Sequence, residues 1–223
     1  MRIILGAIFF ALAILGPAPP MARAEVEITG EARVLDGDTL DIGPVRIRLF
    51  GVDAPETRQT CATSTGAWAC GAAATQRIVD LTEGRDTTCI PVERDAYGRL
   101  VSTCTTEGVD LAETLVAEGL AWAFTRYSDV YAEIEATART RAAGIWQAET
   151  PPAWDWRETA WTSASGTAPA GCPIKGNINR AGTRIYHTPW SRNYARTEIN
   201  EAYGERWFCD EAEALAAGWR APG

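Results

Sequence analysis

The stretch that decides the fold reads VLDGDTLDIGPVRIRLFGVDAPET and runs from residue 34 to residue 57. Apolar and polar residues alternate along it, which predicts short β-strands separated by turns at DGD and IGPV. Three acids and one arginine lie in or directly after these strands: Asp38, Arg48, Asp53 and Glu56. Charged groups near a core are costly unless they are paired or hold a ligand. A cation facing a phosphate group would account for all four.

The segment Val45–Phe50 shows the alternation most clearly. Period-2 geometry puts Arg46 and Arg48 on one face of a strand and the apolar residues on the other. A solvent-facing position is sufficient to explain Arg46. Pro55 then pushes the residue before it out of helical geometry, so we expect the chain to turn sharply at Asp53–Thr57.

The chain downstream alternates between strand and helix patterns. It predicts a loop at 58–71, helices at 72–81, 109–119 and 130–143, and a hairpin of two strands at 87–92 and 100–105. Five strands with interspersed helices predict an α+β fold, namely a five-stranded OB-type β-barrel with about three helices.

The first residues predict export. A basic start, an apolar run and the small-residue end at Ala22–Ala24 indicate a secretory signal peptide over residues 1–24. The alternative is a membrane anchor, but the apolar run is shorter than the roughly 20 residues needed to span a bilayer. We therefore expect a secreted or periplasmic protein without stable membrane insertion.

The remaining chain divides by composition. We expect a barrel domain at 25–150, a linker at 151–170 and a small C-terminal module at 171–223. The linker begins with tryptophans and prolines and ends with Ser, Thr and Gly, a flexible composition. Its tryptophans predict that the first half docks on the domain before it.

All six cysteines follow the predicted cleavage site, which fits an oxidising compartment. Six cysteines allow 15 pairings. Sequential pairing is favoured because each pair then staples one local unit. The predicted disulfides are Cys61–Cys70, Cys89–Cys104 and Cys172–Cys209. No CxxC spacing is present, which disfavours zinc or redox chemistry.

The formal net charge of −8 is unusual for a protein that binds nucleic acid without sequence specificity, because such proteins normally present a basic face. An acidic enzyme can still act on a phosphodiester if a metal and placed arginines meet the phosphate locally. Only one of the 21 basic residues is a lysine, Lys175, so guanidinium forks are expected at any phosphate.

Four motifs, in order and spacing, resemble the staphylococcal nuclease (thermonuclease) family: DGDT (36–39), IRLFGVDAPET (47–57), DAYGR (95–99) and LVAEGLAWA (115–123). The resemblance covers about residues 26–147. It implies an OB-type barrel and calcium-dependent hydrolysis of DNA and RNA. It also implies attack on phosphorus with little base specificity and 3′-phosphate products.

The resemblance also assigns a metal site. Asp38 and Asp53 match the two carboxylates that bind Ca²⁺, a cation that prefers oxygen ligands. The third protein ligand is a backbone carbonyl, which falls on Ala54. Glu56 matches the residue that activates the attacking water.

Two arginines and two tyrosines complete the implied site. Arg48 and Arg99 match the residues that clamp the phosphate, and guanidiniums suit that role because they bind its oxygens in pairs. Tyr127 matches a family tyrosine near the nucleotide, and Tyr97 is retained either as a contact to the substrate or as packing at the hairpin tip. Two departures predict a looser grip: a family tyrosine falls on Thr125 and a phosphate-contacting lysine falls on Ala96.

The C-terminal module contains the only histidine, His187, and two cysteines. Three candidate ligands are too few for a common zinc site, so a disulfide and a packed histidine are expected. Four arginines interleave with three aromatic residues: Arg180, Arg184, Arg192, Arg196, Tyr186, Trp190 and Tyr194. These residues predict either a face for an anionic polymer or a solvated surface over an aromatic core.

Three functions stay open from the sequence. The first is a calcium-dependent nuclease with DNA and RNA as substrates. The second is a non-catalytic binding module for nucleic acid or cell-envelope polymers on the same fold. The third is an enzyme restricted to another phosphodiester, which the acidic surface suggests. Nothing in the sequence indicates a protein partner.

Overall fold

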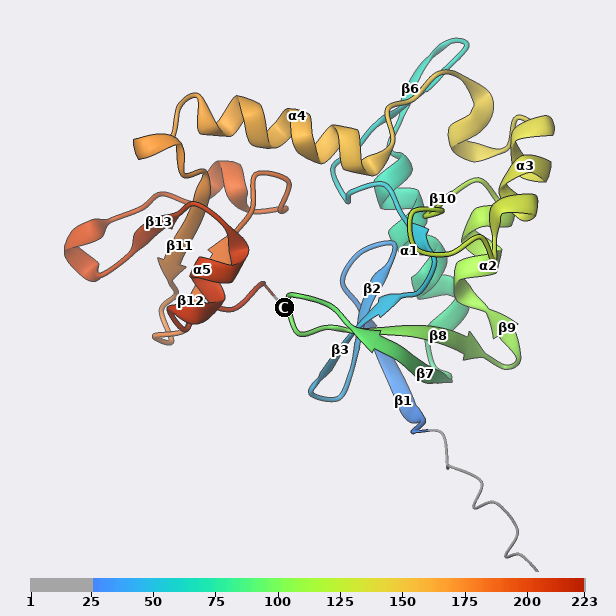
Figure 1. The fold of residues 1–223 in the computed structure, drawn as a ribbon, viewed down its shortest axis with the longest axis horizontal. Coiled ribbons are helices and arrows are strands. Elements are labelled where there is room, and N and C mark those ends of the chain that lie inside the picture. The colour runs from blue at the N-terminus through green and yellow to red at the C-terminus, as the bar shows by residue number, and fades with distance from the viewer. Residues whose placement is uncertain (1–25, 223) are drawn as a thin grey trace, which may run out of the picture.

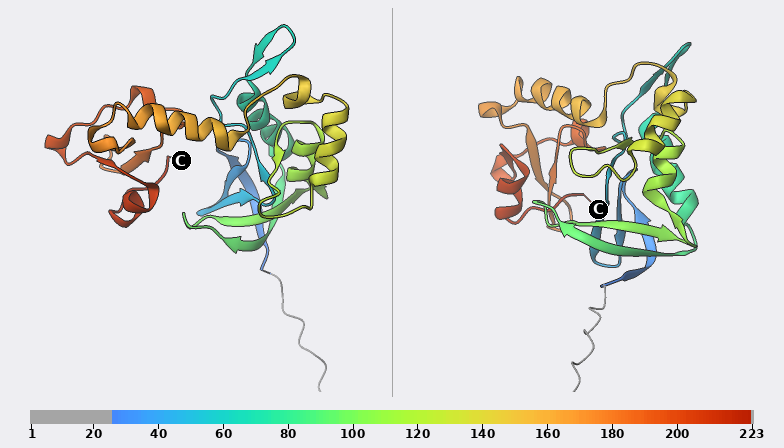
Figure 2. Two further views of the ribbon diagram at one scale, coloured as in Figure 1. Left: turned by 45° about the horizontal axis from the view of Figure 1, so that its top comes forward. Right: turned by 45° about the vertical axis from the view of Figure 1, so that its right-hand side comes forward.

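The structure, a computed structural model, describes residues 26–222. The predicted signal peptide at 1–24 therefore lies outside the described residues. Two lobes follow one another along the chain, and the long helix α4 (Ala153–Ser165) joins them (Figure 1). The same bridging position of α4 is visible in two further orientations (Figure 2).

The first lobe is a closed barrel built around one sheet. Its strands are β1 (Ile28–Val34), β2 (Thr39–Ile42), β3 (Val45–Leu49), β7 (Asp86–Arg94), β8 (Leu100–Thr106) and the short β9 (Val109–Asp110). They pair antiparallel in the order β3-β2-β1-β7-β8-β9, and β3 pairs parallel with β8 to close the barrel. The predicted five-stranded OB-type barrel is confirmed.

The interior of the barrel follows the alternation seen in the sequence. Ile47 and Leu49 are buried, while Arg46 and Arg48 lie on the other face of β3. Three helices cover the barrel, in agreement with the prediction: α1 (Cys70–Thr82), α2 (Leu111–Ala117) and α3 (Ala132–Thr140). Buried side chains from α1 and α2 complete one core with those of the strands.

Short elements fill the connections. They are β4 (Val52–Asp53), β5 (Cys61–Thr63), β6 (Gly66–Trp68), β10 (Trp122–Ala123) and η1 (Gly144–Gln147). The segment 58–71, expected as a loop, thus contains a β5–β6 hairpin, and the Cys61–Cys70 disulfide ties this hairpin to the start of α1. The second pair, Cys89–Cys104, joins directly opposed residues of β7 and β8.

The segment 151–170, expected as a flexible linker, is mostly helical. Helix α4 includes the first residues of the Ser/Thr-rich half, 162–165, and η2 (Pro169–Gly171) follows it. The helix begins on the barrel because Trp154 stacks on Phe124 and meets Trp122 edge-on. The predicted docking on the barrel is therefore observed for Trp154, whereas Trp161 packs against Trp190 and the core of the C-terminal module. This packing at both ends orders a segment whose composition alone favours flexibility.

The second lobe is the C-terminal module. It contains the sheet β12-β11-β13, formed by β11 (Ile174–Ile178), β12 (Arg184–His187) and β13 (Arg206–Phe208), with the turns η3 (Tyr194–Arg196) and η4 (Glu201–Tyr203) and helix α5 (Glu211–Ala216). Its separate small core includes Ile174, Phe208 and Trp219, and Cys172–Cys209 staples it. Within residues 26–222, none of the helices has the length and apolar character needed to cross a bilayer.

Candidate active site

The turn between β1 and β2 places Asp38 against the strand end that carries Asp53. Gly37 makes this approach possible, because a Cβ atom there would lie 2.7 Å from the Ala54 Cβ and 2.9 Å from the Ala74 Cβ. The backbone of Ala54 donates a hydrogen bond of 3.0 Å to Asp38 Oδ2. The glycine of the DGD motif is therefore a packing requirement, because it lets this turn lie against Ala54, the residue that follows Asp53.

Arg48 joins the two aspartates. Its Nη1 lies 2.8 Å from Asp38 Oδ1 and its Nη2 lies 2.9 Å from Asp53 Oδ1. Both aspartates are buried, and Asp53 has no exposed surface. Buried carboxylates need such partners, since an unpaired buried charge is strongly destabilising. The residues predicted as metal ligands and the first predicted phosphate clamp thus share one site.

Glu56 follows on a tight turn held by Gln59. The Gln59 backbone donates to the Glu56 carbonyl at 2.7 Å, and the Gln59 side chain accepts from the Glu56 backbone N–H at 3.2 Å. Gly71 at the start of α1 packs against this turn so closely that a Cβ there would lie 1.7 Å from the Glu56 oxygen. The backbone carrying the Glu56 carboxylate is therefore fixed from two sides.

Arg99 reaches the site from the β7–β8 hairpin. It pairs with Asp95 at 2.7 Å, lies over the Tyr97 ring with 5.5 Å to the centroid, and lines the same cleft as Arg48. Tyr97 and Tyr127 line this cleft as well, and both are substantially exposed. The residues predicted from the family motifs therefore line one cleft, except for the fully buried Asp53, which Arg48 connects to it. Arg99 binds its hairpin neighbour Asp95 and neither Asp38 nor Asp53.

The cleft has a volume of about 980 Å³, and both lobes line it. The barrel supplies the residues described above. The C-terminal module contributes Tyr186, Trp190, Arg192 and Glu211 to the opposite wall. The last residues of the chain close one side, where Arg46 donates a 3.0 Å hydrogen bond to the Pro222 carbonyl. Arg46, for which solvent exposure was expected, is instead paired with Asp41 and with this terminus.

Sequence reasoning missed Arg157 on α4, which binds two acids of the site. Its Nη2 lies 2.6 Å from Asp53 Oδ2, and its Nη1 lies 3.2 Å from Asp53 Oδ1 and 2.8 Å from Glu56 Oε1. The sequence does contain one signal for Arg157, namely that it lies three residues after Trp154. Trp154 was expected to dock on the barrel, and residues three apart on a helix share a face.

Burial and charge act in opposite directions on the acids of the site. Burial would raise the pKa of Asp38, but the Arg48 charge and the Ala54 hydrogen bond outweigh it and hold that pKa below its usual range. Burial raises the pKa of Glu56 to about 8, and the charge of Arg157 opposes this rise. Burial and the neighbouring Asp38 raise the pKa of Asp36, a residue absent from the predicted site, to about 6.

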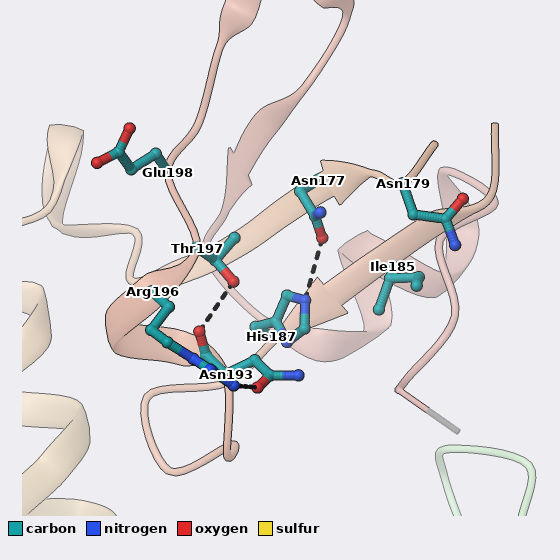
Figure 3. Close-up of a pocket in the computed structure, with 8 residues that line it drawn as sticks. All are labelled: Asn177, Asn179, Ile185, His187, Asn193, Arg196, Thr197 and Glu198. Carbon is teal, nitrogen blue, oxygen red and sulfur yellow. Dashed lines mark hydrogen bonds between the residues drawn. The ribbon is translucent and has the colours of Figure 1, made fainter. Parts of the chain in front are cut away.

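A second cavity of about 400 Å³ lies within the C-terminal module (Figure 3). His187 lines it and is nearly buried, with Nε2 lying 3.0 Å from Asn177 Oδ1. The expected packed histidine is therefore observed. The arginines and aromatics of the module divide among several places: Arg192 and Trp190 line the cleft, and Arg196 lines the second cavity.

Comparisons with known proteins agree with this division into two parts. The family described as Staphylococcal nuclease homologue matches residues 46–148, and the family described as ArfC matches residues 156–221. Arg157 thus lies in the second matched part, whereas the residues predicted from the family motifs lie in or just before the first.

Three relatives match half of the chain or slightly more. Succinoglycan biosynthesis protein ExoI of Rhizobium meliloti (strain 1021) is 39% identical over 134 residues, which is 57% of this chain and 69% of that protein. An uncharacterized endonuclease of Escherichia coli O157:H7 is 33% identical over 133 residues, or 56% of this chain and 81% of the relative. Probable staphylococcal-like nuclease CAN1 of Oryza sativa subsp. japonica is 31% identical over 115 residues, or 50% of this chain and 32% of the relative. The chain belongs to the staphylococcal nuclease family, a family of phosphodiester hydrolases.

Proposed function

We propose that this protein is a calcium-dependent nuclease that hydrolyses DNA and RNA and leaves 3′-phosphate products. One observation carries the proposal: Arg48 bridges two buried aspartates at the wall of a cleft that Glu56 and Arg99 also line. Guanidiniums beside paired carboxylates suit a reaction in which a phosphate approaches a cation.

The donor atoms fit a hard cation in kind. Asp38 and Asp53 offer carboxylate oxygens, and among residues 26–222 no hydrogen bond reaches the carbonyl oxygen of the buried Ala54. Calcium prefers such oxygen ligands. In the conformation described, however, guanidiniums occupy the Asp53 oxygens, and no cluster of three or more His, Cys, Asp or Glu side chains ready for a metal is found in that part of the chain. Arg157 must therefore give way before Asp53 can act as a ligand.

Glu56 and the two arginines have separate roles in the proposed reaction. Glu56 takes a proton from the attacking water as the new P–O bond forms, and Arg48 and Arg99 hold the phosphate oxygens on which charge grows. The bond from phosphorus to the 5′-oxygen breaks, and that oxygen takes a proton from solvent water as it leaves. Bound calcium would supply Lewis acidity and orient the phosphate.

In this proposal the protein recognises the phosphates of the nucleic-acid backbone and stacks aromatic rings on its bases. Tyr97 and Tyr127 present exposed rings to the cleft, and aromatic rings stack on bases of any identity. Arginines are the basic residues that line the cleft, and they suit phosphates. We therefore assign DNA and RNA as substrates, with little base specificity.

The disulfides support a proposal about the compartment. The described chain contains three disulfides and no free cysteine. Such bonds persist in oxidising compartments. Together with the leader-like sequence at 1–24, they favour a secreted or periplasmic location.

A second candidate function is a non-catalytic binding module for nucleic acid or cell-envelope polymers. It is favoured by the complete pairing of Asp53 with Arg48 and Arg157. The name of ExoI, which refers to succinoglycan biosynthesis, also associates a relative of this chain with a polysaccharide.

The deciding experiment measures hydrolysis of a single-stranded DNA oligonucleotide by the purified protein, with calcium and with a chelator. We expect cleavage with calcium, none with the chelator, and 3′-phosphate ends on the products. Glu56→Gln should lose about 10²–10⁴-fold in rate, the typical contribution of a general base. Binding of the oligonucleotide without any cleavage would favour the second candidate. Cleavage that is unaffected by both the chelator and Glu56→Gln would contradict the proposed mechanism.

A further inference from the structure

Arg157 lies outside the part of the chain that the nuclease family matches, yet its guanidinium binds two acids of the nuclease site. The nuclease match ends at residue 148, and the ArfC match begins at residue 156. Both oxygens of Asp53 accept hydrogen bonds from Arg157, and Glu56 accepts a third. The attached part of the chain therefore completes the ion pairing of the site.

The helix that carries Arg157 is firmly positioned. Its first residue, Ala153, is fully buried, and Trp154 stacks on Phe124 with 5.6 Å between ring centroids. The segment before it is tied to the site, because Gln59 Nε2 donates to the Pro151 carbonyl at 2.9 Å. Gln59 is also the residue that holds the Glu56 turn. The contact of Arg157 with the carboxylates is thus built into the fold.

Charge makes this contact incompatible with a divalent cation on Asp53. Three acids, Asp38, Asp53 and Glu56, face two guanidiniums, those of Arg48 and Arg157. A cation bound by Asp53 needs at least one oxygen that Arg157 now occupies, and two like charges repel strongly at that distance. The Arg157 guanidinium must therefore leave Asp53 when the cation binds.

The side chain of Arg157 borders open space in the cleft into which it can move. It is 23% exposed and lines the same cleft as Arg48 and Arg99. A rotation about its side-chain bonds leaves the helix in place and turns the guanidinium from the carboxylates into the cleft, where the phosphate would lie.

Building on the proposed function, we infer that Arg157 is an exchangeable counter-ion that competes with the divalent cation for Asp53 and, once displaced, binds the substrate phosphate. It thereby acts as a third phosphate-binding guanidinium that the C-terminal part supplies to the barrel. Cation and substrate then favour each other, because each stabilises the displaced position of Arg157.

The test compares calcium affinity by titration calorimetry, without substrate, in the wild type, Arg157→Gln and Arg157→Lys. The matched control is Arg180→Gln, because Arg180 is an exposed arginine of the C-terminal module that lines neither cavity. We expect Arg157→Gln to bind calcium about tenfold more tightly, because a guanidinium no longer has to leave the Asp53 oxygens before calcium can bind. Arg157→Lys keeps the charge and should stay near the wild type, as should Arg180→Gln.

The second readout is the KM for a single-stranded oligonucleotide. Arg157→Gln and Arg157→Lys should both raise it, because neither offers the guanidinium fork, while Arg180→Gln should not. Circular dichroism confirms that each variant is folded. Unchanged or weaker calcium affinity in folded Arg157→Gln, with a wild type that cleaves in calcium, overturns this inference and leaves the nuclease function standing. If no variant binds calcium, the inference and the proposed calcium dependence both fail.

Discussion

Arg157 and Asp53 are 104 residues apart in sequence and form a paired contact, with Nη2 2.6 Å from Oδ2 and Nη1 3.2 Å from Oδ1. The contact joins the helix that leads to the C-terminal module with a fully buried carboxylate of the barrel. It therefore links the stability of the candidate site to the part of the chain that follows the nuclease domain.

The first prediction concerns that stability. Arg157→Gln leaves Asp53 with one guanidinium partner, and we expect the free energy of unfolding to fall by about 1–3 kcal/mol without divalent cations. This figure is lower than for a fully buried pair because Arg157 is partly exposed. Urea denaturation followed by circular dichroism measures it, with Arg180→Gln as the control. A loss of the same size in the control would show that the ion pair contributes nothing specific.

Much of the barrel could be predicted because its signals are local. Period-2 alternation in Val45–Leu49 requires only neighbouring residues, and the structure buries Ile47 and Leu49 as expected. The opposition of Cys89 and Cys104 likewise follows from the length of one hairpin.

The role of Arg157 could not be predicted because it depends on tertiary packing. Alanine and tryptophan in the segment 151–170 permit a helix, but the Ser/Thr-rich half favours a flexible linker. The stacking of Trp154 on Phe124 decides the direction of α4, and composition does not encode the angle at which the helix leaves the barrel. Similarly, the pairing of Arg46 with the carbonyl of Pro222 requires the C-terminal module to return to the barrel.

The second prediction separates charge from geometry at Arg48. Its two nitrogens reach two different aspartates, a fork that lysine cannot reproduce. We expect Arg48→Lys to lose about 10²–10³-fold in the initial rate on single-stranded DNA, as for other lost transition-state donors, while its circular dichroism spectrum stays native.

The control for Arg48 is Arg77→Lys. Arg77 also makes a forked pair, with Glu118, but lies on α1 outside the cleft lining. Its rate should remain within about twofold of the wild type, in line with the small energies of surface pairs. An equal rate loss in both variants would point to a general effect of replacing arginine.

The third prediction tests the packing of the DGD turn. In Gly37→Ala the new methyl group meets the Ala54 and Ala74 side chains at under 3 Å, so the turn must shift. We expect a loss of about 1–3 kcal/mol in the free energy of unfolding, the usual cost of overpacking, and reduced activity because Asp38 moves.

Gly166→Ala is the matched control, because the nearest atom to its added Cβ lies at 3.6 Å and its φ of −64° suits alanine. It should be neutral or stabilising by up to about 1 kcal/mol. Adding Ala54→Gly to Gly37→Ala removes the closer of the two contacts and should restore part of the lost stability. No recovery in the double variant would mean that Ala74 alone limits the turn.

The last prediction concerns pH and the C-terminal module. Burial and the nearby positive charge of Lys175 lower the pKa of His187 below its usual 6.5. The unfolded chain therefore binds a proton at pH values where the native state does not, so the contribution of this group to stability falls as the pH drops below 6.5. His187 is the only histidine of the chain, so no other imidazole titrates in this range.

Asp36 and Glu56, whose pKa values are raised to about 6 and about 8, change protonation in the same range with the opposite sign. The measurement is therefore a difference between proteins: urea denaturation at pH 7.5 and 5.5 for the wild type and for His187→Gln. Glutamine keeps a donor for the Asn177 oxygen but carries no titrating group. Acidification should cost the wild type more stability than the variant. An identical pH dependence in the two proteins would show that His187 takes up its proton equally well in the folded module, against the effect of its burial beside Lys175.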